Sequence, residues 1–339
     1  MPVTVLDPFD DVLMARMYDV AVAAKSVERP YFVPVALPAV LAAIRHADPG
    51  ERETMLGTWE GGLLVGVATV WEFLLDNVST AYAQVEVHPD HRRRGHGSAL
   101  VNAVCAMLRD RGRDRLIVET VTPTGSGPDH PHHRFALHHG FVPGEPAVVR
   151  RLALPVRPGL LERLTTEARS AYGSRYAVQT FDVVPDPLRA SLCECMNRVD
   201  ADAPSGEIEW EPESLDPSRY AGQLALDAQM ARTRLTALAT DTGSGDVVAF
   251  TELFLPQAPH PYAHQAGTLV LEAHRGHGLG LAVKAANLAE LGRRFPERTA
   301  VFTGNAVANP WMVAVNDRLG FVPFEAETPY VRSVGLGIR

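Results

Sequence analysis

The feature that most constrains this 339-residue sequence is a glycine-rich hexapeptide that occurs twice. The two copies are Arg92-Arg93-Arg94-Gly95-His96-Gly97 and Arg275-Gly276-His277-Gly278-Leu279-Gly280. Each copy follows an apolar run typical of a strand and precedes an amphipathic run typical of a helix. Such a turn presents backbone N–H groups at a helix N-terminus, where the helix dipole also attracts anions. The glycines would let a ligand approach the backbone, and the arginines would add positive charge. The sequence therefore predicts two loops that bind a pyrophosphate group.

The repeat extends beyond the hexapeptide. Arg92 and Arg275 are 183 positions apart, and the same spacing relates the turn at Gly62 to the turn at Gly245. A closing Gly-Phe pair, at Gly140 and again at Gly320, matches at a spacing of 180. Stacked repeats have much shorter periods of about 20 to 50 residues, so we expect one domain that is duplicated. The prolines and glycine of 155–159 suggest a linker, which predicts domains at 1–155 and 160–339.

The pattern of each half predicts a mixed α/β (α+β) domain, with an antiparallel meander before the hexapeptide and a βα crossover after it. The sheet of each half would be mostly antiparallel and flanked by helices. In the first half, strands are expected at 54–59, 64–75, 80–87, 116–120 and 148–154. In the second half, strands are expected at 176–181, 235–240, 247–255, 264–271, 300–303 and near Tyr330, and helices at 188–198, 220–231 and 310–319.

Composition argues against several classes of protein. The formal net charge is -8, so we expect no binding to nucleic acid, and no apolar run approaches the length that spans a membrane. We expect a cytoplasmic protein. Three cysteines are too few for a disulfide framework and suit buried packing. The histidines between His130 and His139 could chelate zinc, but a solvated helix start suits them better, so we expect no metal.

A dinucleotide-binding turn is the main alternative for the glycine cluster. That fingerprint follows the first strand of a domain and has the spacing Gly-x-Gly-x-x-Gly. Here the glycines come in the middle of each half and have a different spacing. The context therefore argues against a dinucleotide site.

The order of elements, the Arg-x-x-Gly-x-Gly of both halves and the closing Gly-Phe resemble the GNAT superfamily of acyl-CoA N-acyltransferases. The resemblance covers nearly the whole chain as a tandem pair, similar to the mycothiol synthase family, in which the C-terminal unit is usually catalytic. It implies that both hexapeptides bind the coenzyme A pyrophosphate and that the preceding strands splay to admit pantetheine. The pantetheine strands would be represented by Leu269, Val270 and Leu271 in one half and by Val85 and Val87 in the other.

Amide formation from a thioester needs a neutral amine, so a base must take the amine proton directly or through water. His264 and Glu252 are the candidates in the second half, and His264 lies where some relatives carry a catalytic carboxylate. The alternative interpretation of each is a solvated side chain on a strand.

Many relatives place a tyrosine four residues before the closing Gly-Phe, as general acid for the leaving thiolate. This sequence has Asn316 and Ala136 there, and an asparagine can only hydrogen-bond the sulfur or orient a water. Asn305 and Asn309 could contact the pantetheine arm, although a helix N-cap is the default role of Asn309. Lys284 follows the second hexapeptide, and we expect it to be exposed on a helix face.

The resemblance thus implies an enzyme that moves an acetyl or other short acyl group from acyl-CoA to the amine of a small molecule. The C-terminal unit would be catalytic, and the N-terminal unit structural or CoA-binding. The alternatives are a non-catalytic acyl-CoA-binding protein and an acyl-CoA hydrolase or decarboxylase on the same fold. The acceptor would be set by 19–44 and 188–220, and a monomer is compatible with two domains that pair within one chain.

Overall fold

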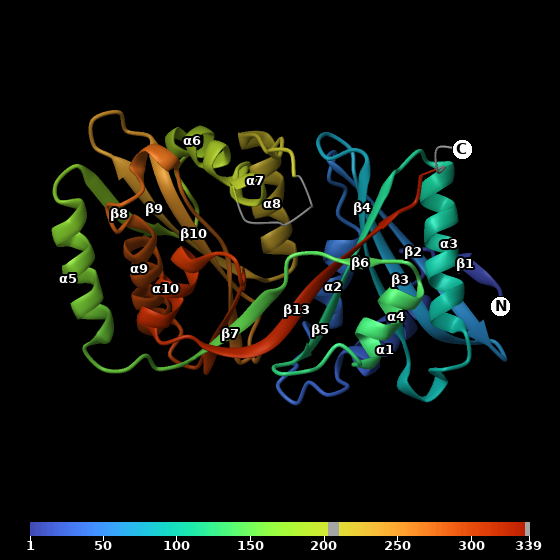
Figure 1. The fold of residues 1–339 in the computed structure, drawn as a ribbon. Coiled ribbons are helices and arrows are strands. Elements are labelled where there is room, and N and C mark those ends of the chain that lie inside the picture. Colours follow the sequence, from blue (N-terminus) through green and yellow to red (C-terminus); the bar gives the residue numbers. More distant parts are fainter. Residues whose placement is uncertain (203–209, 336–339) are drawn as a thin grey trace. The chain divides into compact units, whose positions relative to one another are not determined.

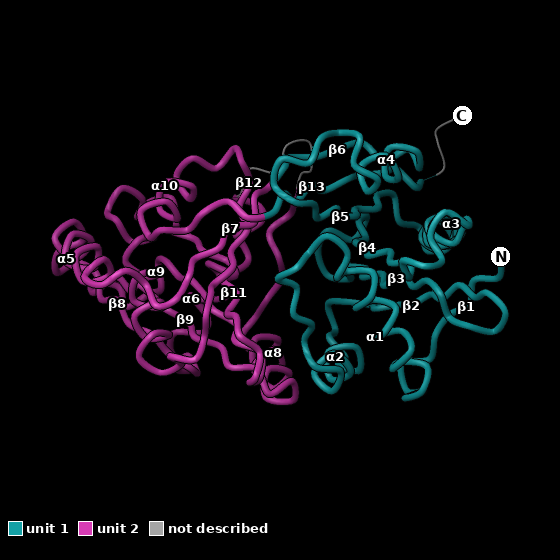
Figure 2. Tube along the Cα trace, turned by 90° about the horizontal axis from the view of Figure 1, so that it is seen from below, with its two compact units in different colours: residues 1–146, 206–208, 325–339 teal, residues 147–205, 209–324 magenta. Residues whose placement is uncertain are grey.

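The computed structural model describes residues 1–202 and 210–335, so part of the expected acceptor region 188–220 lies outside the described residues. The chain divides into two compact units, drawn in teal and magenta in Figure 2. Among the described residues, unit 1 comprises 1–146 and 325–335, and unit 2 comprises 147–202 and 210–324. Each unit is a mostly antiparallel sheet with helices packed on it, as predicted (Figure 1).

Unit 1 is built on the strand order β1-β2-β3-β4-β5-β13, with β6 paired to β13. The neighbours β4 and β5 are parallel, and the other pairs are antiparallel. The strands are β1 (Val3–Val5), β2 (Glu51–Glu60), β3 (Leu63–Phe73), β4 (Thr80–Val87), β5 (Arg115–Pro123), β6 (Val142–Pro143) and β13 (Val322–Ser333). The helices are α1 (Asp11–Lys25), α2 (Leu37–Ile44), the 3-10 turn Pro89–His91, α3 (His96–Asp110) and α4 (Pro131–His138).

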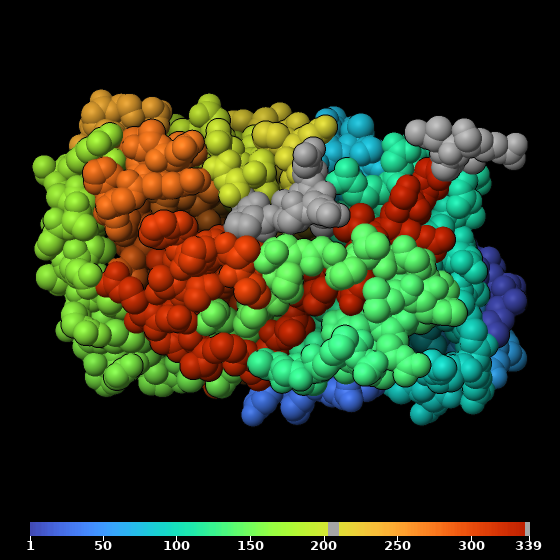
Figure 3. All heavy atoms as spheres, in the orientation of Figure 1, coloured from blue at the N-terminus to red at the C-terminus, as the bar shows by residue number. Residues whose placement is uncertain are grey.

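Unit 2 has the strand order β7-β12-β11-β10-β9-β8, in which β11 and β12 are parallel. The strands are β7 (Ala147–Ala153), β8 (Tyr176–Phe181), β9 (Thr233–Asp241), β10 (Val247–Leu255), β11 (Tyr262–Val270) and β12 (Ala300–Ala306). The helices are α5 (Leu160–Tyr172), α6 (Asp186–Met196), α7 (Val199–Asp202), α8 (Pro217–Gln229), the 3-10 turn Glu272–His274, α9 (Leu279–Arg294) and α10 (Pro310–Leu319). The outer sides of α5 and α10 form part of the surface of this unit (Figure 3).

The last strand of each sequence half completes the other unit. Strand β7 pairs with β12, from Ala147 opposite Ala306 to Ala153 opposite Ala300. Strand β13 pairs with β5 over 325–333. This exchange corrects the predicted boundaries of 1–155 and 160–339, because backbone pairing, and not sequence order, decides to which sheet each strand belongs.

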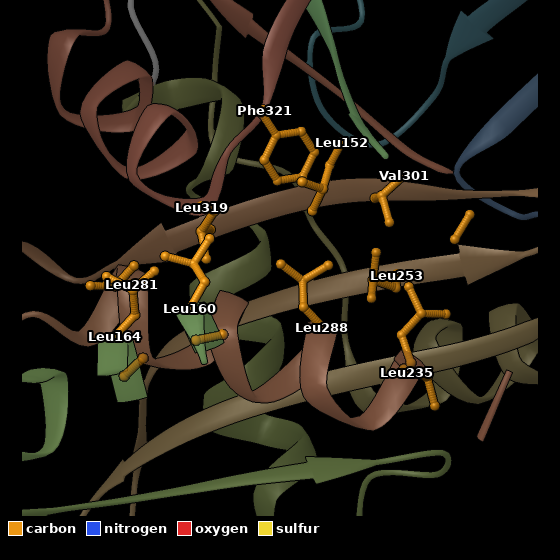
Figure 4. Close-up of a cluster of buried hydrophobic side chains, with 14 of the residues drawn as sticks. Leu152, Leu160, Leu164, Leu235, Leu253, Leu281, Leu288, Val301, Leu319 and Phe321 are labelled. Carbon is orange, nitrogen blue, oxygen red and sulfur yellow. The ribbon is translucent and has the colours of Figure 1, made fainter. Parts of the chain in front are cut away.

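The hydrophobic cores confirm the exchange. Leu152 of β7 is 4% exposed and packs with Leu235, Leu288 and Phe321 in the core of unit 2 (Figure 4). Tyr330 of β13 is buried in the core of unit 1. Each exchanged strand therefore contributes buried apolar area, and not only backbone hydrogen bonds, to the unit that it joins.

Helix α5 was not expected from the sequence. It begins directly after the predicted linker, and Leu160, Leu164 and Ala168 repeat at a spacing of four. This spacing places all three on one helix face, where they pack into the core of unit 2. The prolines and glycine before α5 mark the start of this helix, and the unit boundary precedes β7.

The exchange of strands predicts which unit a core mutation destabilises. Leu152→Ala should cost about 2 to 5 kcal/mol, and the faster hydrogen exchange should appear in α9 of unit 2. Leu116→Ala is the matched control, because this leucine of β5 is buried in the core of unit 1 and should loosen α3. Faster exchange in α3, and not in α9, in the Leu152 variant would contradict the observed pairing.

Candidate active site

The parallel strands β11 and β12 of unit 2 part in the middle of the sheet. Their pairing runs from Tyr262 opposite Ala300 to Gln265 opposite Thr303 and ends there. Beyond this point β11 continues along β10, with Val270 opposite Ala249, whereas 304–306 of β12 pair with β7. The parted section of β11 contains Leu269 and Val270, two of the residues expected to line a pantetheine site, and Leu271 follows directly.

The glycine-rich loop of unit 2 lies at the end of the parted strand. Gly276 and Gly278 have φ angles of +84° and +72°, which a residue with a Cβ adopts only with strain. Helix α9 begins at Leu279, and among the residues that the structure describes no side chain caps its N-terminus. Its first N–H groups lack intrahelical acceptors, so the loop has the donor set and the dipole that suit a pyrophosphate.

The first arginine of each hexapeptide binds the protein itself. Arg275 donates from Nε to the carbonyl of Val270 at 3.1 Å, and its Nη2 lies 3.0 Å from Asp202 Oδ2. Arg92 makes the equivalent Nε bond to the carbonyl of Val87, also at 3.1 Å. These arginines therefore hold the strand end to the loop, a positioning role that the expectation of added charge did not include.

In unit 1 the carboxylate of Glu60 is hydrogen-bonded to cationic side chains at the glycine-rich loop. Glu60 accepts bonds of 2.7 Å from both His91 and Arg94, and these bonds lower the pKa of Glu60 to about 2. His96 is 3% exposed and lies 3.1 Å from Thr58 Oγ1, so it supports the loop from inside. A pyrophosphate would have to compete with Glu60 for Arg94.

The two loops also differ in the space beside the helix start. A Cβ on Gly97 would lie 3.0 Å from Cζ of Phe135, whereas the first atom that a Cβ on Gly280 would meet is Val270 Cγ2 at 3.6 Å. In unit 1 the parallel pairing of β4 and β5 also ends early, at Ala83 opposite Val118. The parting of the strands is thus present in both units, but a side chain of α4 covers the helix start in unit 1. The expected pantetheine residues Val85 and Val87 lie on this parted section of β4, and the neighbouring Arg93 adopts a positive φ of 63°.

A buried polar chain crosses unit 2 from α9 to β12. Lys284 is 1% exposed, and its Nζ donates to Asn316 Oδ1 at 2.8 Å. Asn316 then donates from Nδ2 to Asn305 Oδ1 at 3.0 Å. Burial lowers the pKa of Lys284 to about 7. The expectation of an exposed lysine is wrong, and the signal was present, because small apolar residues surround Lys284 in the sequence of α9.

Glu252 is not the solvated side chain of the alternative interpretation. It is 3% exposed and accepts bonds from Arg234 Nη1 at 3.1 Å and Thr236 Oγ1 at 3.0 Å. Arg234 also donates to Asp227 Oδ2 at 2.6 Å, so the carboxylate belongs to a buried ion-pair network. An amine proton would therefore have to compete with two donors for this group.

His264 lies on β11 one residue before the strands part, and its side chain keeps solvent contact. The ring stacks on Phe302 with centroids 6.1 Å apart and lies 5.9 Å from the ring of His260. Burial of the packed part of the ring, with the positive charges of His260 and Arg298, lowers the pKa of His264 to about 4. The imidazole is therefore neutral at neutral pH and can accept a proton.

The remaining predicted residues have structural contacts. Asn309 accepts a 3.1 Å bond from the Met312 amide and caps α10, as its default role required. The ring of His277 lies 5.6 Å from that of Tyr176. The three cysteines are buried. Part of the histidine cluster is buried too, because His133 is 9% exposed and bonds to Tyr330.

Unit 1 contains titratable groups that the sequence analysis missed. Glu119 follows the last β4–β5 pair and accepts a 2.6 Å bond from the Tyr82 hydroxyl. Burial and the neighbouring charge of Glu119 raise the pKa of Glu327 to about 7. Glu86 of β4 is paired with Lys25 at 3.2 Å. The proximity of Glu327 to Glu119 depends on the exchanged strand β13, so sequence order alone gives no signal for it.

Metal clusters and membrane-spanning helices are both absent from the described residues. Within 1–202 and 210–335, no group of three or more histidine, cysteine, aspartate or glutamate side chains could hold a metal ion. Over the same residues, no helix combines the length and apolar character needed to cross a membrane.

The buried ammonium of Lys284 predicts a pH-dependent contribution to stability. Its ordinary pKa of 10.5 falls to about 7 in the folded protein, so the unfolded chain binds one more proton between these values. The free energy of unfolding of the wild type should therefore rise with pH from about 7 to about 10, by up to about 1.4 kcal/mol per pH unit, relative to Lys284→Met. Denaturant titrations measure the difference, and parallel curves for the two proteins would contradict the assignment.

Comparison with known proteins identifies the fold. Residues 21–141 match the model of the Acetyltransferase (GNAT) family. The uncharacterized N-acetyltransferase YedL of Escherichia coli (strain K12) is 31% identical over 99 residues, which are 29% of this chain and 59% of that protein. The chain thus spans less than two thirds of that curated relative.

Two solved structures cover both units. One is a tandem GNAT protein from the clavulanic acid biosynthesis pathway, solved without acetyl-CoA, with a TM-score of 0.77, 24% identity and 99% coverage of both chains. The other is a GCN5-related N-acetyltransferase from Sphaerobacter thermophilus, with a TM-score of 0.66, 17% identity, and coverage of 99% of this chain and 96% of that one. The repeated loops, the parted strands and these likenesses together show that the chain has the fold of tandem GNAT proteins.

Proposed function

We propose that this protein is an N-acyltransferase that moves an acetyl or other short acyl group from acyl-CoA to the amine of a small molecule, and that unit 2 holds the reaction. The observation that carries the proposal is the uncapped, glycine-rich start of α9 beside the parted strands β11 and β12. A dipolar anion site next to a slot between strands suits a ligand with a pyrophosphate at one end and an extended arm.

In this proposal the pyrophosphate binds the backbone of Arg275 to Gly280. The pantetheine arm runs between the parted strands, along 269–271 at the end of β11 and toward Asn305 and Asn309. Backbone N–H groups of the parted section of β11 then lie near the thioester and can stabilise the developing oxyanion.

The reaction itself needs little from side chains. The amine lone pair attacks the thioester carbonyl carbon, a C–N bond forms, the C–S bond breaks, and the electron pair leaves with the sulfur. The nitrogen loses one proton, which passes to a base or to water. A thiol with a pKa near about 8.5 is a tolerable leaving group even without a strong acid.

His264 is the better of the two candidate bases. Its imidazole is neutral at neutral pH and reaches solvent, whereas Glu252 is fully buried and already accepts from Arg234 and Thr236. A base with a pKa of about 4 holds a proton weakly. His264 would therefore pass the amine proton on to water and would not stay protonated.

Unit 1 is proposed as a structural or CoA-binding unit, because Glu60 and Phe135 lie on its loop. A specific observation nevertheless favours a second candidate, in which unit 1 carries out the transfer. The family model matches within unit 1, and Glu327 has a pKa of about 7, well suited to a general base. Glu327→Gln would then abolish turnover while His264→Ala would not.

The loop assignment predicts a difference between two matched variants. Gly278→Val should weaken acyl-CoA binding strongly, because a β-branched residue at this positive φ strains the loop and shields its amides. Gly95→Val is the control at the equivalent position of the other loop, where φ is +90°, and should change the affinity less. Calorimetry with acetyl-CoA measures the affinity, and circular dichroism checks the fold. Unchanged affinity in the folded Gly278 variant would remove the assignment.

The base assignment predicts that His264→Ala lowers turnover by roughly 10² or more with little change in acyl-CoA affinity. The loss should shrink as pH rises, because more of the free amine is then neutral. Glu252→Gln is the paired variant. If only the Glu252 variant loses turnover, the role passes to Glu252, and if neither does, the amine is captured in its neutral form.

Release of coenzyme A, measured with and without a panel of amines, separates the reaction classes. Amine-dependent release supports the transferase. Release without any amine would indicate a hydrolase or decarboxylase, and binding without release would indicate a non-catalytic acyl-CoA-binding protein. Mass spectrometry of the products identifies the acceptor and the acyl group.

A further inference from the structure

The two units differ at one pair of equivalent buried positions. By the spacing of 183 that relates the hexapeptides, Lys284 of α9 is equivalent to Val101 of α3. By the spacing of 180 that relates the closing Gly-Phe pairs, Asn316 of α10 is equivalent to Ala136 of α4. Val101 and Ala136 are buried at 2% and 3% exposure in the core of unit 1. The repeat thus has an apolar pair in one copy and a hydrogen-bonded lysine and asparagine in the other.

The fold does not require the polar pair. Unit 1 shows that the same architecture accommodates Val101 and Ala136, and a buried charge generally stabilises a protein no better than apolar residues of similar volume. Burial also lowers the pKa of Lys284 to about 7, so its ammonium form is held at a cost in folding free energy. Burial of the Lys284 ammonium costs folding free energy, and the equivalent position of unit 1 holds a valine. We therefore expect Lys284 to have a role other than stability.

Lys284 and Asn316 are buried, at 1% and 0% exposure, and their hydrogen-bond chain ends on the strand that borders the gap. Asn305, which accepts from Asn316, is two residues beyond Thr303, the last residue of β12 that pairs with β11. The Lys284 ammonium bonds to the carboxamide oxygen of Asn316, which fixes the orientation of the amide and directs its NH₂ group toward β12. A cation on the oxygen also draws electrons from the amide nitrogen and makes its N–H groups better donors.

We propose that Lys284 is a positioning residue for the leaving group, which holds the Asn316 carboxamide so that one N–H bonds Asn305 and the other meets the sulfur of the departing thiolate. The inference rests on the proposed function of unit 2. As the C–S bond breaks, the electron pair stays on sulfur, and the N–H donor and the nearby ammonium stabilise the negative charge. No proton needs to move in this step, and the thiolate takes one from solvent after release.

The test transplants the pair of unit 1 into unit 2. The double variant Lys284→Val with Asn316→Ala should fold, bind coenzyme A with nearly unchanged affinity, and lose turnover by about 10² to 10³, the range for loss of one charge-stabilising donor. Each single variant, Lys284→Met and Asn316→Ala, should lose nearly as much as the double, because the lysine acts through the asparagine.

A second readout does not depend on turnover. The ultraviolet absorbance of the thiolate reports the pKa of the coenzyme A thiol while it is bound. This pKa should be higher in the double variant than in the wild type, since the variant lacks the donor and the charge. A purely structural role would leave it unchanged.

The outcomes are distinct. Wild-type turnover and an unchanged thiol pKa in a folded double variant would overturn the inference and leave the proposed function in place. Failure of both the double variant and Lys284→Met to fold would also overturn it, because the pair would then be structural. Absence of coenzyme A binding to the wild-type protein in calorimetry would instead overturn the proposed function.

Discussion

The architecture depends on the early end of a parallel strand pairing. The parallel pairing of β11 and β12 ends at Gln265 and Thr303, in the middle of the sheet. Strand β11 keeps β10 as its partner, and β12 obtains β7, which comes from the first half of the sequence. In unit 1, β13 from the second half of the sequence pairs with β5 in the same way. Each diverging strand therefore keeps a hydrogen-bonded neighbour on the edge that faces away from the gap, so the sheet continues on both sides of it.

The two units use the same scaffold with different chemistry. In unit 1 the cationic loop holds Glu60, and the start of α3 lies against Phe135. In unit 2 the loop arginine Arg275 is paired with Asp202, and Lys284 and Asn316 form a hydrogen-bonded pair in the interior. The units also differ outside the loop and the gap, because α6 to α8 of unit 2 stand where unit 1 has α1 and α2.

Local sequence patterns predicted the elements well. The strands 80–87, 176–181 and 247–255 and the helix 310–319 have the predicted bounds, because turn residues and changes in periodicity mark their ends. The pairing partners of β7 and β13 could not be predicted, since a strand exchange depends on contacts distant in sequence. The prediction of an exposed Lys284 also failed for a physical reason. Lysine is almost always at the surface, and only the packing of α9 against α10 shows that it is buried.

In the candidate site, too, features set by adjacent residues could be predicted, and features set by contacts distant in sequence could not. The loops, whose chemistry depends on adjacent residues, could be located from the hexapeptides, and the N-cap role of Asn309 followed from the proline after it. The ion-pair network of Glu252 could not, because Arg234 and Asp227 lie on other elements.

Hydrogen exchange of the wild-type protein with and without coenzyme A tests the central claim most directly. The account predicts that coenzyme A slows exchange at the amides of 276–282 and of the parted section of β11, with little change at 93–99. Protection confined to the start of α3, with none at the start of α9, would contradict it and move the reaction to unit 1.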